Sequence, residues 1–212
     1  MGELAWTPAL VDYFVRGGSW MWALLACSVI ALAIIIYKSI TLWVAGRGAR
    51  PLVADTIRLV EAGEMEQAAR QASLSSSSVA AVLGSTLAAA QASFISPREA
   101  AAAAGAEEMA SLEAGLPALS TVASIAPLIG FLGTVSGMIR AFTAIAEHGM
   151  GEPAIVAAGI GEALITTASG LIVAIPCFIA YSVFVARVNS IALSMEIAGS
   201  RVASMISGDE AA

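Results

Sequence analysis

The sequence has little charge, little histidine and little cysteine, and each shortage excludes a class of protein. Only 12% of its 212 residues are charged, whereas soluble proteins carry about 25%. A chain this apolar is not a disordered one, and its net charge of −6 argues against nucleic-acid binding. A single histidine leaves little for a zinc site or a histidine-based catalytic triad. Cys27 and Cys177 both lie in apolar runs, so no disulfide framework is predicted.

Apolar residues make up 58% of the chain, which is more than a soluble domain of this size can bury. They gather in three runs, 20–44, 116–146 and 154–186, each long enough to cross a hydrocarbon core of about 30 Å. A cleaved signal peptide is the alternative for the first run, since Ala31-Leu32-Ala33 resembles a cleavage site. Acidic residues before this run, and its continuation past that site, favour a membrane span. The composition therefore predicts an all-α membrane protein with three transmembrane helices.

The positions of lysine and arginine predict the orientation of these helices. The cations that flank the spans are Lys38, Arg47, Arg50 and Arg58 after the first run, and Arg187 and Arg201 after the third. Because such residues gather on the cytoplasmic side, we expect an outer N-terminus, an outer turn and a cytoplasmic C-terminus. The predicted segments are an outer-surface (periplasmic) segment 1–18, transmembrane helix 19–44, a cytoplasmic helical region 45–115, transmembrane helix 116–147, an outer turn 148–153, transmembrane helix 154–187 and a cytoplasmic C-terminal helix 188–212.

Two helices are predicted outside the membrane. Ser96 and Glu99 form a capping box that opens a helix in the cytoplasmic region. If this helix is continuous to residue 146, it is 50 residues or about 75 Å long, with Pro117 and Pro127 as kink positions. Near the N-terminus, Thr7 is a candidate N-cap, and Gly17-Gly18 ends the short helix that it opens. This short helix either lies on the outer membrane surface or is a plain spacer.

Small residues are dense on the second and third runs. Helices in a bilayer associate through close packing and polar contacts, so this density predicts helices packed on several sides. A homo-oligomer or a helical partner would supply the missing neighbours. The candidate packing residues are Gly130, Gly133 and Gly137 on the second run, and Ala157, Ala158, Gly161, Ala168 and Gly170 on the third.

The two membrane charges of the hairpin lie at equal distances from its turn. Arg140 precedes residue 151 by 11 residues and Glu162 follows it by 11, so we expect them at one outer level and in contact. Alternatively, Arg140 snorkels to the surface while Glu162 faces a polar cavity or a partner, as intramembrane carboxylates do. Thr134 and Thr167 share a deeper level, although each hydroxyl can instead bond to its own helix.

Two segments have a familiar pattern. Residues 126–142, APLIGFLGTVSGMIRAF, and 158–176, AGIGEALITTASGLIVAIP, resemble the MotA/TolQ/ExbB proton-channel family. Three spans with a cytoplasmic stretch after the first resemble its ExbB/TolQ branch. The resemblance implies a pentameric ring in the inner membrane that encloses the single transmembrane helices of an ExbD- or TolR-type partner. An aspartate of that partner would carry the protons.

The resemblance also assigns roles to residues. Thr134 and Thr167 match the pore threonines, and Glu162 matches the glutamate inside the pore. Thr166 and Ser169, at i+4 and i+7 from Glu162, lie on its face and are expected to line the pore as well. Arg140 is the expected charge partner at the pore entrance. Ser136 and Arg140 depart from the pattern of the best-known members, where these positions are often bulkier or uncharged. Thr167 lies about 140° around an ideal helix from Glu162, so one polar file does not follow from the sequence.

The function that this pattern implies is the conversion of proton-motive force into work on a TonB- or TolA-like protein acting at the outer membrane. A non-conducting scaffold remains an alternative. A small secondary transporter is another, although the chain shows no inverted repeat. An enzyme is disfavoured because no nucleophile is paired with a base, and no cofactor or metal is expected.

Overall fold

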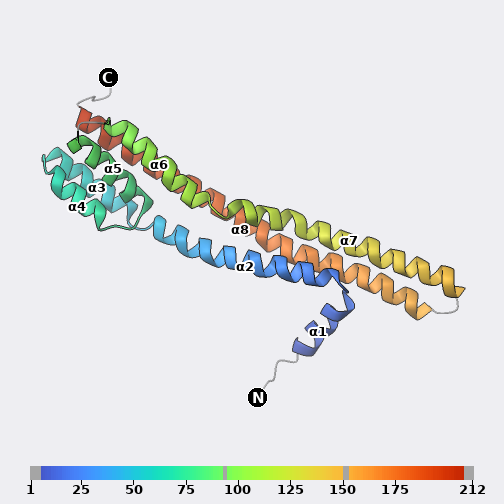
Figure 1. Cartoon of the computed structure of the whole chain (residues 1–212). Helices are drawn as coiled ribbons and strands as arrows, with labels where there is room; N and C mark the ends of the chain where they lie inside the picture. The colour runs from blue at the N-terminus through green and yellow to red at the C-terminus, as the bar shows by residue number, and fades with distance from the viewer. Residues whose placement is uncertain (1–5, 93–94, 150–152, 208–212) are drawn as a thin grey trace, which may run out of the picture. The chain divides into compact units, whose positions relative to one another are not determined.

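A computed structural model of the chain describes residues 6–92, 95–149 and 153–207 (Figure 1). The described residues fold into α-helices: α1 Trp6–Arg16, α2 Trp20–Ala45, α3 Ala49–Glu61, α4 Met65–Ser73, α5 Ser78–Ala92, α6 Pro97–Glu113, α7 Leu116–His148 and α8 Pro153–Ser207. Three helical stretches are long and apolar enough to cross a membrane, namely Trp20–Ala45, Pro97–Glu147 and Pro153–Ser207. The predicted all-α fold with three spans is therefore confirmed.

The chain divides into two compact units. The first comprises residues 1–35 and 117–181, and the second comprises residues 36–116 and 182–212. The first unit thus holds α1, the start of α2, most of α7 and the first half of α8. The second unit holds the end of α2, helices α3 to α6 and the end of α8.

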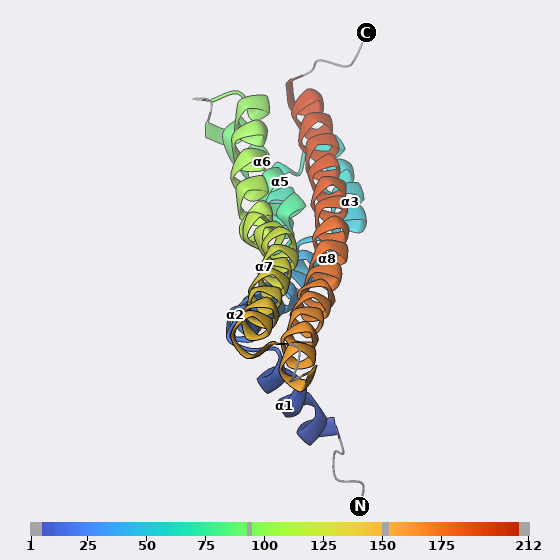
Figure 2. The same cartoon turned by 90° about the vertical axis from the view of Figure 1, so that its right-hand side faces the viewer.

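In the first unit, α7 and α8 run side by side in opposite directions in both views (Figure 1, Figure 2). The predicted hairpin is present, while residues 150–152 of its turn lie outside the described residues. A small apolar cluster of Leu24, Ala126 and Ala174 joins α2 to this pair. Large apolar side chains remain on the outside, including Phe131 at 65% and Ile172 at 70% exposure. This pattern is typical of helices surrounded by lipid or by further chains.

The second unit has a core of large aliphatic side chains. The members that are at most 2% exposed include Val79, Val82, Leu83, Leu87, Val188 and Val202. The predicted cap of α6 is confirmed, because the Ser96 hydroxyl accepts a hydrogen bond from the Glu99 N–H at 3.2 Å and Pro97 occupies the first turn.

The helix that begins at Pro97 is not continuous to residue 146. Helix α6 ends at Glu113, and α7 begins at Leu116. Gly115 between them adopts φ +83°, a left-handed conformation that ends helices and that glycine adopts without a steric penalty. Pro117 then lies in the first turn of α7, where a missing N–H costs nothing. Gly115 and Pro117 together were the stop signal.

Two further helix ends differ from the expectation. The short N-terminal helix does end at Gly17-Gly18, but Thr7 lies inside α1 and not at its N-cap. Helix α8 continues without a break from Pro153 to Ser207, so the predicted third transmembrane helix and the C-terminal helix are one element.

Candidate functional site

Helices α7 and α8 of the first unit meet through glycines, which lets their backbones touch. A Cβ added to Gly130 would lie 2.9 Å from the Thr166 carbonyl oxygen, and one added to Gly170 would lie 2.6 Å from that of Ala126. Near the turn, a Cβ on Gly137 would lie 2.7 Å from the Gly159 carbonyl oxygen. Side chains at these positions would force the helices apart, so the contact depends on glycine.

Four of the candidate packing glycines lie in the contact between α7 and α8, and Gly161 lies outside it. Gly130, Gly133, Gly137 and Gly170 all lie in the α7–α8 contact, whereas a Cβ at Gly161 would meet nothing within 4 Å. Gly159, which is not among the candidates, lies in this contact as well, because a Cβ on it would lie 2.9 Å from the Gly137 carbonyl oxygen. The signal was available, because Gly159 lies 11 residues from Gly170, about 20° apart on a helix, while Gly161 lies about 180° away.

The threonines of α8 are held inside the hairpin. Thr166 is fully buried against Gly133, and its hydroxyl donates to the carbonyls of Glu162 and Ala163, each at 3.0 Å. The prediction that Thr166 lines a pore is therefore wrong, because its side chain reaches no surface. Thr167 is half-buried and donates across the helices to the Gly130 carbonyl at 3.1 Å.

The Thr167 hydroxyl also donates within α8, to the Ala163 carbonyl at 3.2 Å. The Thr134 hydroxyl donates to the Phe131 carbonyl on its own helix, as the backbone-bonded alternative foresaw. Thr167 therefore differs from Thr134 in joining the two helices directly.

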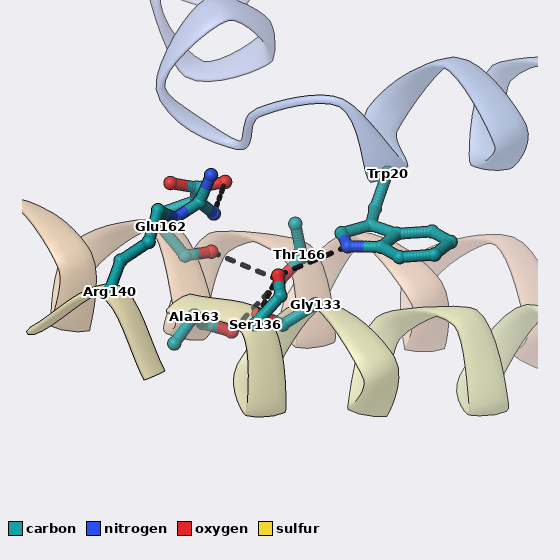
Figure 3. Close-up of polar contacts among 7 residues, drawn as sticks. All are labelled: Trp20, Gly133, Ser136, Arg140, Glu162, Ala163 and Thr166. Atoms are coloured by element: carbon teal, nitrogen blue, oxygen red, sulfur yellow. Dashed lines mark hydrogen bonds and ion pairs between the residues drawn. The ribbon is translucent and has the colours of Figure 1, made fainter. Parts of the chain in front are cut away.

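Arg140 and Glu162 form an ion pair through the Arg140 Nη2 and the Glu162 Oε1 (Figure 3). The predicted contact between them is confirmed. The Glu162 side chain is only 15% exposed, whereas that of Arg140 is 53% exposed. The carboxylate is thus largely withdrawn from solvent and neutralised by a cation of the neighbouring helix, which offsets part of its desolvation cost. The role of the pair at a pore entrance stays a prediction.

The polar residues proposed to line one pore face three different cavities of the single chain. Glu162, Arg140 and Arg16 line one of about 510 Å³. Thr134 lines a groove on α7, and Ser169 lines a cavity against α1 and α2. No common polar file is formed by the described residues of one chain, so a shared pore requires other copies or partners.

No group of three or more acidic, histidine or cysteine side chains that could hold a metal ion occurs among residues 6–92, 95–149 and 153–207. The donor chemistry near the hairpin is that of hydroxyls, backbone carbonyls and one ion pair. Such groups can pass or orient protons through hydrogen bonds.

The sequence model of the MotA/TolQ/ExbB proton channel family matches residues 71–197, which include Thr134, Arg140, Glu162 and Thr167. The chain belongs to this family. Its ExbB/TolQ branch includes a Tol-Pal system protein TolQ of Haemophilus influenzae, 49% identical over 84 residues, or 40% of this chain and 37% of that one. A putative biopolymer transport protein ExbB-like 1 of Synechocystis is 35% identical over 193 residues, covering 86% of this chain and 73% of the relative.

The matches to the TolQ proteins, and to one ExbB protein, cover less than half of the length of each relative. The chain spans 37% and 33% of the lengths of the TolQ proteins of Haemophilus influenzae and Pseudomonas aeruginosa. A biopolymer transport protein ExbB of Pseudomonas putida is 37% identical over 98 residues, 46% of this chain and 30% of the relative. Family membership and three apolar helices make this chain a multi-pass membrane protein of the ExbB/TolQ branch.

Proposed function

We propose that this chain is a subunit of a proton channel that uses proton-motive force to drive work at the outer membrane. It acts in the inner membrane together with an ExbD/TolR-type single-span protein, and the protein it energises is TonB- or TolA-like. The N-terminus and the hairpin turn face the periplasm, and the C-terminus faces the cytoplasm, in accord with the distribution of lysine and arginine.

One observation carries this proposal beyond family membership. The hairpin has hydroxyls at the level of Thr134 and Thr167, but its charged residues, Arg140 and Glu162, neutralise each other at another level. A proton that crosses at the threonine level therefore needs a carboxylate from a different chain. An aspartate on a single-span partner supplies this group, and the threonine hydroxyls can donate to its charged form and accept from its protonated form.

The proposal includes a ring of copies, and the outer surface of the hairpin supports this part of it. The outward apolar side chains of α7 and α8, such as Phe131, Leu164 and Ile172, need lipid or protein neighbours. Because Glu162, Thr134 and Ser169 face different cavities of one chain, adjacent copies must combine their faces to make one polar lining. A pentamer is the assembly that the ExbB/TolQ resemblance implies.

Proton uptake into liposomes tests the proposal. We expect uptake, driven by a potassium diffusion potential and followed with a pH-sensitive dye, only when the chain and an ExbD/TolR-type protein are reconstituted together. Thr167→Val should reduce uptake at least tenfold because it removes the hydroxyl that joins the helices, and Thr167→Ser should restore it. Thr121→Val is the matched control, since Thr121 is exposed and its hydroxyl donates only to the Pro117 carbonyl of its own helix.

The outcomes separate the alternatives. Absence of uptake from correctly assembled complexes would favour the non-conducting scaffold. Full activity of Thr167→Val would remove the threonine from the path. Native mass spectrometry of the chain in a mild detergent should show an oligomer, and a purely monomeric chain would contradict the ring.

A further inference from the structure

The turn between α1 and α2 lies directly on the Glu162 carboxylate of the first unit. Gly18 adopts φ +71°, and a Cβ at this position would collide with the Glu162 Oε1 and lie 2.7 Å from its Cδ. Gly17 is buried, and a Cβ on it would lie 3.2 Å from Ile165, one helical turn further along α8. Two successive glycines thus let the bare backbone of the turn cover the carboxylate.

Trp20 fastens this turn to the hairpin. Its indole N–H donates to the Ser136 hydroxyl on α7 at 3.0 Å, and the Ser136 hydroxyl donates to the Gly133 carbonyl at 3.3 Å (Figure 3). Trp22, only two residues away, is 67% exposed and contacts Phe14 of α1 edge-on, with the ring centroids 5.0 Å apart. Trp20 is half-buried, and its ring is directed inward to a specific acceptor. An indole N–H that leaves water needs such an acceptor.

The two contacts are neighbours on α7. Ser136 and Arg140 are separated by one helical turn and lie on the same side of the helix. Ser136 holds the start of α2, while Arg140 holds the carboxylate that the preceding turn covers. Trp20 is thus two residues from Gly18, which touches Glu162. The hydrogen bond from Trp20 to Ser136 therefore holds the α1–α2 turn close to the Glu162 carboxylate.

We propose that Trp20 and Ser136 are positioning residues that keep the α1–α2 turn closed over the Arg140–Glu162 pair, and that this closure limits the access of external water and protons to the outer end of the path. The inference rests on the proposed function for its physiological meaning. The closure itself is a property of this chain alone. A cavity of about 510 Å³ borders the pair, and Arg16, the last residue of α1 before the turn, lines it together with Arg140 and Glu162.

Cysteine labelling measures the closure without any proton flux. Gly161 lines the same cavity, and a Cβ there meets nothing within 4 Å, so Gly161→Cys introduces a thiol without a clash. In full-length chain with Cys27→Ser and Cys177→Ser, reconstituted in liposomes, a membrane-impermeant methanethiosulfonate reagent reports access to this thiol. We expect Trp20→Phe and Ser136→Ala each to raise the labelling rate about fivefold, the factor that corresponds to one ordinary hydrogen bond.

Matched variants distinguish positioning from general loosening. Ser136→Thr retains the hydroxyl acceptor and should label at the parent rate, as should Trp43→Phe, since Trp43 is 59% exposed and its ring stacks with Arg47 at the opposite end of α2. The Trp20→Phe and Ser136→Ala double variant should label no faster than either single variant, because both remove the same bond. A thiol introduced as Thr143→Cys, on an exposed part of α7 that lines a different groove, should react equally in all backgrounds.

Equal labelling of Gly161→Cys in the parent and in Trp20→Phe would overturn the proposal. So would single-variant effects that multiply, or an equal acceleration at Thr143→Cys. Because labelling requires neither a partner nor a proton gradient, its result is independent of whether the chain conducts. In co-reconstituted liposomes, the same Trp20→Phe variant should raise partner-dependent proton uptake severalfold while Trp43→Phe leaves it unchanged.

Discussion

The two units hold their helices together by opposite means. In the first unit, α7 and α8 touch at glycines such as Gly130 and Gly170, and the large apolar side chains point outward. In the second unit, large side chains such as Leu83 and Leu87 are fully buried. The hydrophobic effect drives burial of large side chains from water, whereas helices in lipid gain little from it and instead pack closely. The difference indicates that the helices of the first unit are the ones that lie mainly in the bilayer.

Charge is treated differently as well. Glu162 in the first unit has a countercharge, Arg140. Lys38 in the second unit is 1% exposed, and its ammonium donates to the backbone carbonyls of Ser111 at 3.3 Å and Leu112 at 2.9 Å. These carbonyls belong to the last turn of α6, where the helix dipole favours a cation. A helix C-terminus can therefore accommodate a buried cation, while the carboxylate of Glu162 is held by a cationic side chain.

The largest expected effect tests the packing of the second unit. Leu83→Ala should lower the free energy of unfolding by about 3 kcal/mol, because it removes a fully buried side chain and leaves a cavity. Leu74→Ala is the control, since Leu74 is 87% exposed and should change stability little. Thermal unfolding in detergent, followed by circular dichroism, measures both. Equal stabilities of the two variants would contradict the core described for this unit.

An intermediate effect tests the ion pair of the first unit. Arg140→Gln should destabilise the hairpin by about 2 kcal/mol, less than for a fully buried pair because half of the Arg140 side chain is exposed. Glu162→Gln should have a similar effect, and the double variant should be less impaired than the sum of the two. Unfolding titrations with sodium dodecyl sulfate complete this cycle. Strict additivity would show that the two side chains do not interact.

The smallest effect tests the glycine contact. Gly170→Ala should destabilise the hairpin by about 1 kcal/mol, since its Cβ would lie 2.6 Å from a backbone carbonyl and the helices must separate. Gly161→Ala should be neutral or slightly stabilising, because alanine favours the helix and meets no neighbour. The same unfolding titration compares them. If Gly161→Ala were the more harmful variant, the assignment of the packing face would be reversed.

Local patterns were enough to predict several features. The capping box at Ser96 involves residues only three positions apart. Arg140 and Glu162 were paired by counting residues outward from the turn of the hairpin. The helix end at Gly115 was not predicted, because the alanine-rich stretch before it has high helix propensity. Gly115 and Pro117, two positions apart, were nevertheless a local signal for it. Gly159 was absent from the candidate packing residues, although a count from Gly170 places the two glycines on the same face of the helix.

By itself, the sequence determined the all-α class, the three apolar spans and the hairpin, since hydropathy and charge act along the chain. Only the tertiary structure decided that Lys38 caps α6 and that Trp20 reaches Ser136. The first contact joins Lys38 to Ser111, 73 positions away, and the second joins residues 116 positions apart. Such contacts depend on how helices rotate about their axes and slide along one another. Both are decided by close packing, at glycines in the first unit and among large side chains in the second, and hydropathy does not encode this packing.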